Sequence, residues 1–196
     1  MIAIVDYGAG NLNSVKKAFE YLNADVTVTD QPEVLAAADK VVLPGVGHFS
    51  SLQALDTKGL REPLLQSALA GKPFLGICLG MQWLFEGSEE CIEVAGAGLF
   101  SGRCRQFPPS VKSPHVGWNS VAIQENSRLL RGIAPHSFFY YTHSFYVPVL
   151  PETAAVTEYG LQFGAAVERD NIFGVQFHPE KSGKEGLSIL RNFCEV

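Results

Sequence analysis

One cysteine stands where its neighbours would make it a nucleophile. Cys78 lies between Gly76 and Gly80 in the run Phe74–Gln82, after an apolar stretch typical of a buried strand and before a helix-forming stretch. A Gly-x-nucleophile-x-Gly pattern at a strand-to-helix turn exposes the middle side chain at the carboxyl end of the strand. Glycine fits the flanking positions because a larger side chain would crowd the neighbouring strand and helix. The pattern favours a nucleophilic Cys78 over a small buried hydrophobe, which an isolated cysteine more often is.

A cysteine nucleophile requires a base, and the base requires an orienting group. Of the five histidines, His178 is the strongest candidate, because it ends an apolar strand within Gly174–Glu180. Pro179 favours an extended backbone at His178, and residues two apart in an extended chain point to the same side. Glu180 can then hold one ring nitrogen while the other faces Cys78. The predicted catalytic set is Cys78, His178 and Glu180.

A nucleophile that attacks an acyl group also needs donors for the oxyanion that develops. The turn supplies one donor, the backbone N–H of Leu79, which directly follows the nucleophile. For the second donor we predict the N–H of Val46, because Gly45 and Gly47 on either side permit its peptide to reorient. On the glycines alone, an ordinary strand-to-helix turn remains the alternative for this loop.

The other three cysteines lie in no comparable context. Cys91, Cys104 and Cys194 form no C-x-x-C pair with each other or with Cys78, which argues against a zinc ribbon or a redox dithiol. We therefore predict that these three are structural and that the chain holds no metal.

The first half of the sequence alternates between strand and helix signals. The predicted strands are Ile2–Val5, Asp25–Thr29, Val41–Leu43 and Phe74–Ile77, and the predicted helices are Asn11–Leu22, Pro32–Ala38, Leu60–Leu69 and Met81–Glu86. Such alternation predicts a mostly parallel sheet with helices on both faces. Ligands of open α/β sheets bind outside the carboxyl ends of the strands. We therefore expect three segments to share one rim: Asp6–Asn11, Pro44–Gly47 and Cys78.

The second half has a different character. Predicted strands, several of them antiparallel, are Gly98–Phe107, His115–Ile123, Phe138–Val147, Ala154–Tyr159, Ala165–Arg169 and Ile172–Phe177, and Ser182–Phe193 is predicted to be a closing helix. The expected fold class is α/β, with three layers, a mostly parallel central sheet and added antiparallel strands in this half.

Composition limits the classes of protein that fit. The 196 residues suggest a single domain, 1–196, and 46% hydrophobic residues are enough for a sizeable core. A net charge of −5, with no basic cluster larger than Lys16–Lys17, argues against a partner that is a nucleic acid. The amino terminus lacks the pattern of a signal peptide, and no apolar run approaches the roughly 20 residues that span a membrane. We expect a cytoplasmic protein with reduced thiols and no membrane partner.

Six blocks carry a resemblance to known proteins: Asp6–Asn11, Pro44–Phe49, Cys78–Gln82, Pro114–Asn119, Tyr141–Phe145 and His178–Ser182. In this order they resemble the class I, triad-type glutamine amidotransferases, and more narrowly the glutaminase subunits of imidazole glycerol phosphate synthase. The resemblance covers essentially the whole chain, with no departure at a catalytic position. It implies a flavodoxin-like α/β fold.

The resemblance also implies a reaction. Cys78 would attack the side-chain amide of glutamine, His178 would pass the thiol proton to the leaving ammonia, and water would hydrolyse the glutamyl thioester to glutamate. No cofactor is expected, since a thiolate is itself strongly nucleophilic. The positions that resemble substrate contacts are Gly47, Gln82, Glu90, His143, Ser144 and Phe145. Taken alone, Glu90 would be read as a solvated charge beside Ser88 and Glu89.

A partner follows from the same resemblance. The ammonia would pass into a (β/α)8 cyclase subunit, with which the chain would form a heterodimer in histidine biosynthesis. Four positions resemble interface residues, although core or plain surface positions are the alternative for them: Trp118, Asn119, Tyr140 and Lys181. The glycines around Val46 suggest that the free subunit holds this peptide turned away until the ligand of the synthase favours the active state.

Three other functions remain open from the sequence. The glutaminase could serve a synthase that makes anthranilate, aminodeoxychorismate or guanylate, although Pro114–Asn119 and Thr142–Phe145 favour the imidazole glycerol phosphate branch. A non-catalytic flavodoxin-like module could bind a phosphate at Gly8 and Gly10, but Gly8-Ala9-Gly10 is a short fingerprint. An esterase or γ-glutamyl peptidase would release its product without depending on a partner.

Overall fold

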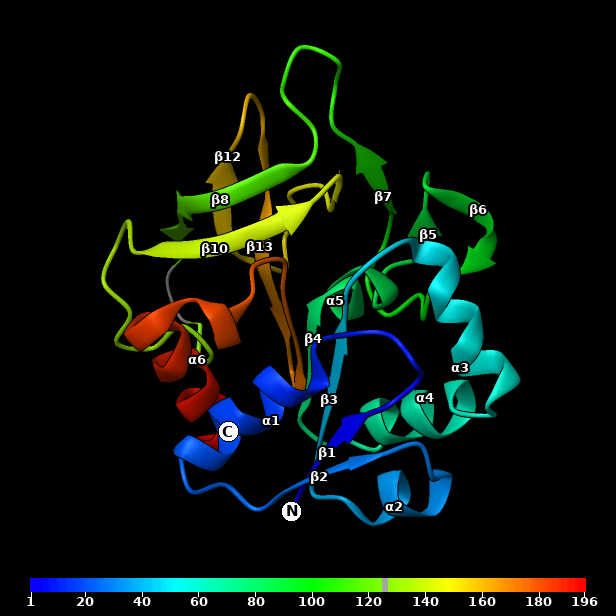
Figure 1. Cartoon of the computed structure of the whole chain (residues 1–196). Helices are drawn as coiled ribbons and strands as arrows, with labels where there is room; N and C mark the ends of the chain where they lie inside the picture. The colour runs from blue at the N-terminus through cyan, green and yellow to red at the C-terminus, as the bar shows by residue number, and fades with distance from the viewer. Residues whose placement is uncertain (125–126) are drawn as a thin grey trace.

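An eight-stranded sheet, counted over the described residues, forms the centre of the molecule (Figure 1). The computed structural model describes residues 1–124 and 127–196. Across the sheet the strands are β2 (Val26–Thr29), β1 (Ile2–Val5), β3 (Lys40–Gly45), β4 (Phe74–Cys78), β14 (Ile172–Val175), β13 (Gln162–Arg169), β12 (Thr153–Glu158) and β9 (Ala122–Ile123). The first five run parallel, and from β14 onward each neighbour is antiparallel. The predicted α/β class, with a mostly parallel sheet and antiparallel strands in the second half, is confirmed.

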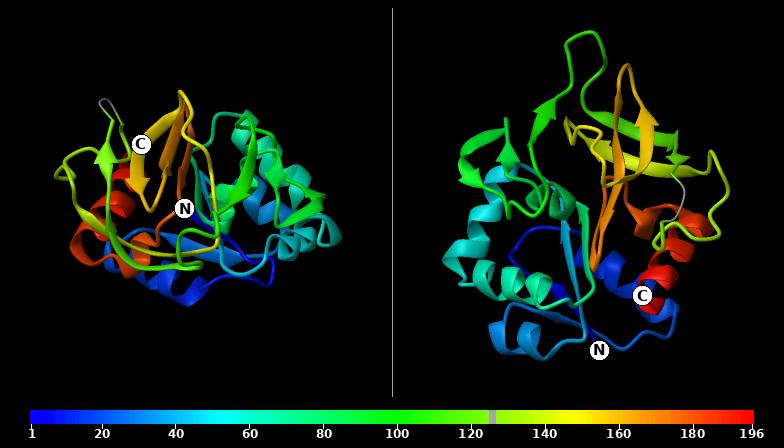
Figure 2. Two further views of the ribbon diagram at one scale, coloured as in Figure 1. Left: turned by 90° about the horizontal axis from the view of Figure 1, so that it is seen from above. Right: turned by 180° about the vertical axis from the view of Figure 1, so that it is seen from behind.

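Helices cover both faces of the sheet, as the two further views show (Figure 2). The helical segments are α1 (Leu12–Tyr21), α2 (Pro32–Ala37), η1 (Phe49–Leu52), α3 (Gln53–Thr57), α4 (Arg61–Leu69), α5 (Leu79–Trp83), η2 (Pro179–Lys181) and α6 (Gly183–Glu195). Alternation along β1 assigns the faces, because neighbouring side chains of a strand point to opposite sides. Ile2 and Ile4 pack in the cluster that contains α1 and α6, whereas Ala3 and Val5 pack with α2, α3, α4 and α5.

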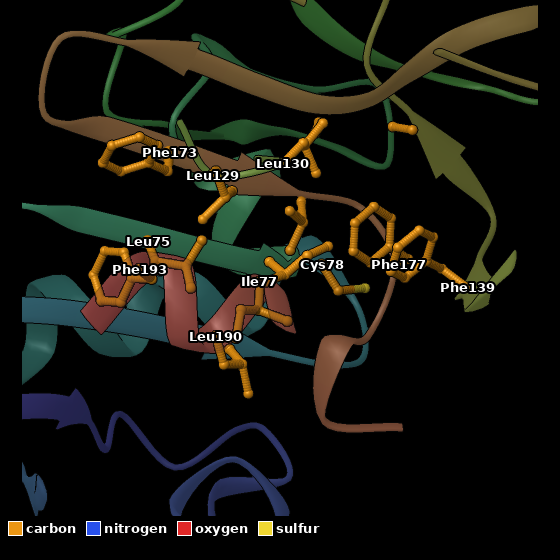
Figure 3. Packing of buried hydrophobic residues seen from close by; sticks show 14 of the residues in the cluster. Leu75, Ile77, Cys78, Leu129, Leu130, Phe139, Phe173, Phe177, Leu190 and Phe193 are labelled. Atoms are coloured by element: carbon orange, nitrogen blue, oxygen red, sulfur yellow. The ribbon is translucent and has the colours of Figure 1, made fainter. Parts of the chain in front are cut away.

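Apolar side chains of β4 and α6 form the layer that leads to the candidate nucleophile. Figure 3 shows Leu75 and Ile77 of β4 beside Phe193 and Leu190 of α6, with Cys78 at the end of this layer. All four of these hydrophobic side chains are essentially fully buried. The rigid core therefore holds the backbone of β4 up to the residue where the chemistry is expected.

Two smaller sheets lie over the carboxyl end of the parallel strands (Figure 1). One pairs β8 (His115–Ser120) with β10 (Phe138–His143). The other is ordered β11 (Phe145–Tyr146), β7 (Arg103–Gln106), β5 (Gly87–Ser88) and β6 (Cys91–Ala95). The strand β10 reaches the segment that follows β14, because the N–H of His178 donates to the carbonyl of Tyr140 at 2.8 Å.

Most predicted elements are confirmed, with boundaries that move by one to three residues. Three predicted strands are corrected. The strand predicted from Gly98 begins only at Arg103, because positive φ angles at Gly98 and Gly102 belong to a turn. The segments 115–123 and 138–147 are each divided between two sheets, at Val121 and at Ser144. An alternating pattern continues through such a division, so the sequence did not reveal it.

Smaller differences concern the helices and the connecting segments. Helix α5 begins at Leu79 and ends at Trp83, in place of the predicted helix over Met81–Glu86. The short elements α3, β5 and β6 were not predicted. No helix in the described ranges has both the length and the apolar character needed to cross a membrane.

Candidate active site

The turn at Cys78 has the geometry of a nucleophile elbow. Cys78 takes φ +53° and ψ −106°, a conformation that costs a residue other than glycine about 1–3 kcal/mol. A Cβ at Gly80 would overlap the carbonyl oxygen of Leu43 on the neighbouring strand β3, and one at Gly76 would overlap the Gly80 carbonyl in α5. Both glycines are therefore required by close approach, as the sequence predicted.

The three segments expected on one rim come together. The register of β3 against β4 places Gly45 opposite Cys78, so Val46 and Gly47 follow directly beside the elbow. A Cβ at Gly10, in the segment after β1, would lie 3.6 Å from the Cα of Gly45. Val46 therefore follows the residue paired with Cys78, and Gly47 after it lines the pocket; the role of the Val46 N–H as an oxyanion donor stays a prediction.

The candidate base comes from the strand next to β4. Val175 pairs with Ile77, so the residues after β14 run beside the elbow. His178 Nδ1 lies 2.9 Å from Glu180 Oε1, and the two side chains are only 2% and 1% exposed. Within the described ranges, His178 Nε2 and Glu180 Oε2 are buried without a hydrogen-bond partner. One ring nitrogen is thus held by the carboxylate and the other is left for the thiol.

The charge state of His178 depends on both neighbours. Burial lowers the pKa of His178, but charge attraction to Cys78, followed by the hydrogen bond and charge attraction to Glu180, outweighs burial and raises this pKa to about 10. The raised pKa suits His178 to accept the proton of the Cys78 thiol, and its Nε2 is the ring nitrogen not held by Glu180.

Cys78 opens into a pocket of about 250 Å³. Its side chain is 5% exposed, and the sulfur lies 3.9 Å from the carbonyl oxygen of Thr142 and 3.6 Å from Gln176 Nε2. All six predicted substrate contacts line this pocket together with Cys78 and Leu79; they are Gly47, Gln82, Glu90, His143, Ser144 and Phe145. His48, Pro114 and Thr142 also line it and were not predicted.

The carboxylate of Glu90 is fixed at the pocket wall. Glu90 Oε2 accepts a hydrogen bond from the backbone N–H of Phe49, at the start of η1, over 2.7 Å. This contact spans 41 residues of sequence, so Glu90 is not simply a solvated charge beside Glu89. A fixed carboxylate in the pocket can bind a cationic group of a substrate.

A larger hollow of about 490 Å³ lies elsewhere, beside Glu152, Glu168 and Asp170. Its lining residues include neither a cysteine nor a histidine. The smaller pocket holds the nucleophile, so it is the candidate active site.

The predicted interface residues divide between two faces. The Trp118 ring lies 6.1 Å from that of Tyr140, and Lys181 Nζ lies 5.8 Å from the Tyr140 ring. These three share an outer surface with Val116 and Phe138. Asn119 points to the opposite face of β8, where its Nδ2 donates to the carbonyl of Glu158 at 2.9 Å.

The remaining cysteines are free thiols. Cys104 is fully buried, and burial raises the pKa of its thiol. Over the described ranges, no group of three or more His, Cys, Asp or Glu side chains is placed to hold a metal ion.

Sequence reasoning missed two buried polar side chains beside the pocket. Gln176 contacts the Cys78 sulfur, and His115 contacts His143 through Nδ1 and Nε2 at 2.9 Å. For Gln176 a signal existed, because it stands two residues before His178 and extended residues two apart share a face. For His115, no pattern in the sequence indicates that it lies opposite His143 across two strands.

Comparison with known families gives a match over nearly the entire chain. A family model described as glutamine amidotransferase class-I matches residues 3–196. The imidazole glycerol phosphate synthase subunit HisH of Methanothermobacter thermautotrophicus is 52% identical over 197 residues, which cover 100% of this chain and 98% of that protein. The subunit HisH of Moorella thermoacetica is 48% identical over 198 residues, which cover 100% of this chain and 94% of that protein.

Solved structures share the fold. A crystal structure of a glutamine amidotransferase matches with a TM-score of 0.76 and 16% identity, covering 100% of this chain and 98% of that chain. The structure of PurLQS from Thermotoga maritima matches with a TM-score of 0.75 and 20% identity, covering 99% and 97%. At these identities the structural likeness concerns the fold alone.

Proposed function

Because the chain belongs to the class I glutamine amidotransferases, and within them to the HisH subunits of imidazole glycerol phosphate synthase, we propose that it hydrolyses glutamine at Cys78 for histidine biosynthesis. The observation that carries this proposal is the strained Cys78 elbow beside the buried His178–Glu180 pair. It opens into a pocket of a size that suits one amino acid. The named relatives favour this branch over the other synthases that use a glutaminase.

The mechanism divides one difficult displacement into two easier steps. His178 first takes the proton of the Cys78 thiol; the sulfur then attacks the amide carbon of the glutamine side chain, and the N–H groups of Leu79 and Val46 hold the oxyanion. His178 then gives its proton to the nitrogen as the C–N bond breaks and ammonia leaves. Glu180 keeps the imidazole oriented. Water next attacks the thioester, which releases glutamate and restores the thiol.

The pocket provides groups for the two ends of glutamine. Glu90, fixed by the Phe49 N–H, would pair with the α-ammonium group. Gln82 and main chain at Gly47 and Ser144 would contact the remaining amino-acid groups. A substrate without the α-ammonium group would leave the Glu90 carboxylate unpaired, so we expect discrimination against it.

The relatives are named as subunits, and this chain is likewise one subunit of a complex. We propose that its partner is a (β/α)8 cyclase that receives the ammonia, and that it docks on the surface formed by Trp118, Tyr140 and Lys181. An aromatic pair beside a cation is typical of an interface centre. The cytoplasmic location and the single-domain boundaries 1–196 stay predictions from the sequence.

Co-purification with a (β/α)8 cyclase, followed by an assay for glutamine-dependent turnover of its ribotide substrate, tests the proposal. We expect a 1:1 complex whose turnover is lost in Cys78→Ser and retained when ammonia replaces glutamine. Glutamate release by the free chain at the same rate as in the complex would indicate a partner-independent hydrolase instead. Failure of a glutamine-mimicking electrophile to label Cys78 would overturn the catalytic assignment.

A further inference from the structure

A fully buried glutamine contacts the nucleophile and has no role in the mechanism above. Gln176 follows β14, whose register pairs Val175 with Ile77, so Gln176 stands opposite Cys78. Its Nε2 lies 3.6 Å from the Cys78 sulfur, within the range of a hydrogen bond to sulfur. The side chain is 0% exposed. Which end of the amide faces the sulfur decides what Gln176 can do, because only the nitrogen donates.

The neighbouring groups settle the orientation of that amide. The carbonyl oxygen of Phe145 can only accept, so the Gln82 amide presents its nitrogen to it, at 3.0 Å. The same Gln82 Nε2 lies 3.2 Å from the Gln176 amide, which must therefore present Oε1. This leaves the Gln176 nitrogen toward the Cys78 sulfur. Both amide orientations, that of Gln82 and that of Gln176, thus follow from the Phe145 carbonyl oxygen, which cannot act as a donor.

The carbonyl oxygen of Phe145 also accepts a hydrogen bond from His143, which is itself paired with His115. His143 Nδ1 lies 2.8 Å from the Phe145 oxygen and must donate to it. Burial lowers the pKa of His143 to about 3, so the ring is neutral and its Nε2 accepts. His115 Nδ1, at 2.9 Å, then donates to His143 Nε2. His115 Nε2 in turn accepts from Asn119 Nδ2 at 3.3 Å.

We propose that Gln176 is a further catalytic residue, whose Nε2–H donates to the Cys78 sulfur and favours the thiolate, and that His115 is a positioning residue for it. His115 acts through one relay of hydrogen bonds, formed by Asn119, His115, His143, the Phe145 carbonyl, Gln82 and Gln176. The inference rests on the proposed role of Cys78 as the nucleophile.

The strength of the hydrogen bond from Gln176 depends on whether the Cys78 sulfur is a thiol or a thiolate. In the thiol form, Sγ–H can donate to the Thr142 carbonyl at 3.9 Å. When the proton moves from Sγ to His178 Nε2, the sulfur becomes an acceptor only. The Gln176 N–H then gains strength, because a hydrogen bond to a charged group is about twice as strong as one between neutral groups. The donor thus favours the reactive form over the resting form.

Alkylation of Cys78 by iodoacetamide, followed by mass spectrometry of the Cys78 peptide from pH 5 to pH 10, measures this directly. Gln176→Met keeps an unbranched side chain and removes the donor. We expect alkylation at pH 7 to slow about tenfold and its pH midpoint to rise by about one unit, the effect of one hydrogen bond to a charged group. The control is Gln162→Met, on the exposed surface of β13. Unchanged rate and midpoint in Gln176→Met would overturn the proposal.

Several other titratable groups face Cys78, and all of them remain in the variant. They are His178 directly before η2, Glu180 on η2, His143 on β10, Tyr7 after β1, Cys104 on β7, and His48 and Glu90 across the pocket. A shift between wild type and variant therefore reports the substitution. If Gln176→Met does not fold, Gln176→Glu keeps an acceptor for Gln82 and takes its place, with slower alkylation expected and an unchanged rate counting against the donor.

The relay has its own tests. In protein labelled with ¹⁵N-histidine, long-range ¹H–¹⁵N spectra should show both His115 and His143 as neutral Nδ1–H tautomers, and an Nε2–H tautomer at His143 would overturn the relay.

His115→Phe should slow Cys78 alkylation, whereas His115→Asn, which can still present a donor at the Nδ1 position, should restore it. Equal rates in both variants and the wild type would contradict the positioning role. Alkylation needs neither glutamine nor a partner, so these results are independent of the proposed function.

Discussion

At the scale of single residues, the charge on His178 links catalysis to stability. Its pKa is raised to about 10, from 6.5, by Cys78 and Glu180 in opposition to burial. A raised folded-state pKa means that protonation stabilises the fold fully below about 6.5 and that this stabilisation is lost as pH rises through about 10. The pH range over which this stabilisation is lost is therefore set by the two pKa values of His178, 6.5 and about 10, and not by the isoelectric point.

The expected consequence is a stability difference that depends on pH. The free energy of unfolding of the wild type, minus that of His178→Gln, should fall by at least about 1.4 kcal/mol between pH 6.5 and pH 10. Urea denaturation at four pH values in this range measures it. His136→Asn, which changes an exposed histidine in a turn, serves as the control. A difference that stays constant or grows with pH would contradict the assignment.

Residue types that carry a chemical signature were predictable, and those that act through orientation were not. Cys78, His178 and Glu180 could be proposed as a catalytic set from the glycine spacing and from extended-chain geometry, and the structure places His178 beside Glu180 as that geometry predicted. In the sequence, Gln176 looks like one polar residue in an apolar strand. The orientation of its amide depends on the carbonyl of Phe145, which acts on it through Gln82, and only folding brings these three residues together.

At the scale of elements, the elbow depends on how closely α5 approaches β3. The backbone of Gly80 touches the carbonyl of Leu43, so no side chain fits between the two elements. The strained φ of Cys78 persists because β4 is held on both sides, by β3 and by β14. Strain of this kind is retained only when the surroundings fix it.

Gly80→Ala should therefore be far more costly than an alanine at an open glycine. We expect the free energy of unfolding to fall by about 3 kcal/mol or more, since neither backbone can yield. Gly71→Ala is the matched control, because Gly71 has φ +84° and open space around it, and only about 1 kcal/mol is expected. Urea denaturation of both variants gives the comparison. Equal losses of unfolding free energy in the two variants would mean that glycine is needed at position 80 for its backbone conformation and not for the close approach of α5 to β3.

The element boundaries show where sequence patterns fail. Strands of the parallel half were predictable because each apolar run is followed by a helix signal. The run 115–123 reads as one strand, yet β8 pairs with β10 and β9 pairs with β12. Alternation records which face is buried and carries no information on which sheet receives the strand.

At the scale of the whole molecule, one outer surface is apolar without a covering element in the described part of the chain. Trp118, Val116 and Phe138 are 56%, 55% and 57% exposed and lie on β8 and β10. Exposed apolar groups gathered on one face mark an interaction site. The face adjoins η2, which carries Glu180, so a partner bound there would stand beside the catalytic set.

Trp118→Glu should weaken the complex and leave the free subunit intact. We expect the affinity for the proposed cyclase partner to fall at least about 30-fold, the loss of about 2 kcal/mol that defines a dominant interface residue. The unfolding free energy of the free subunit should change by less than about 0.5 kcal/mol. Calorimetric titration measures the affinity. Leu69→Glu, on the exposed side of α4, is the control, and an equal loss there would refute a specific interface.

The place of β14 in the sheet has a consequence for synthesis of the protein. This strand enters between β4 and β13, and Gln176 meets Cys78 across 98 residues of sequence. A chain that has left the ribosome only as far as β13 carries Cys78 without His178, the proposed base, and without Gln176. Under the proposed mechanism, hydrolysis of glutamine therefore has to wait until the last strand of the sheet has been synthesised and has paired with β4.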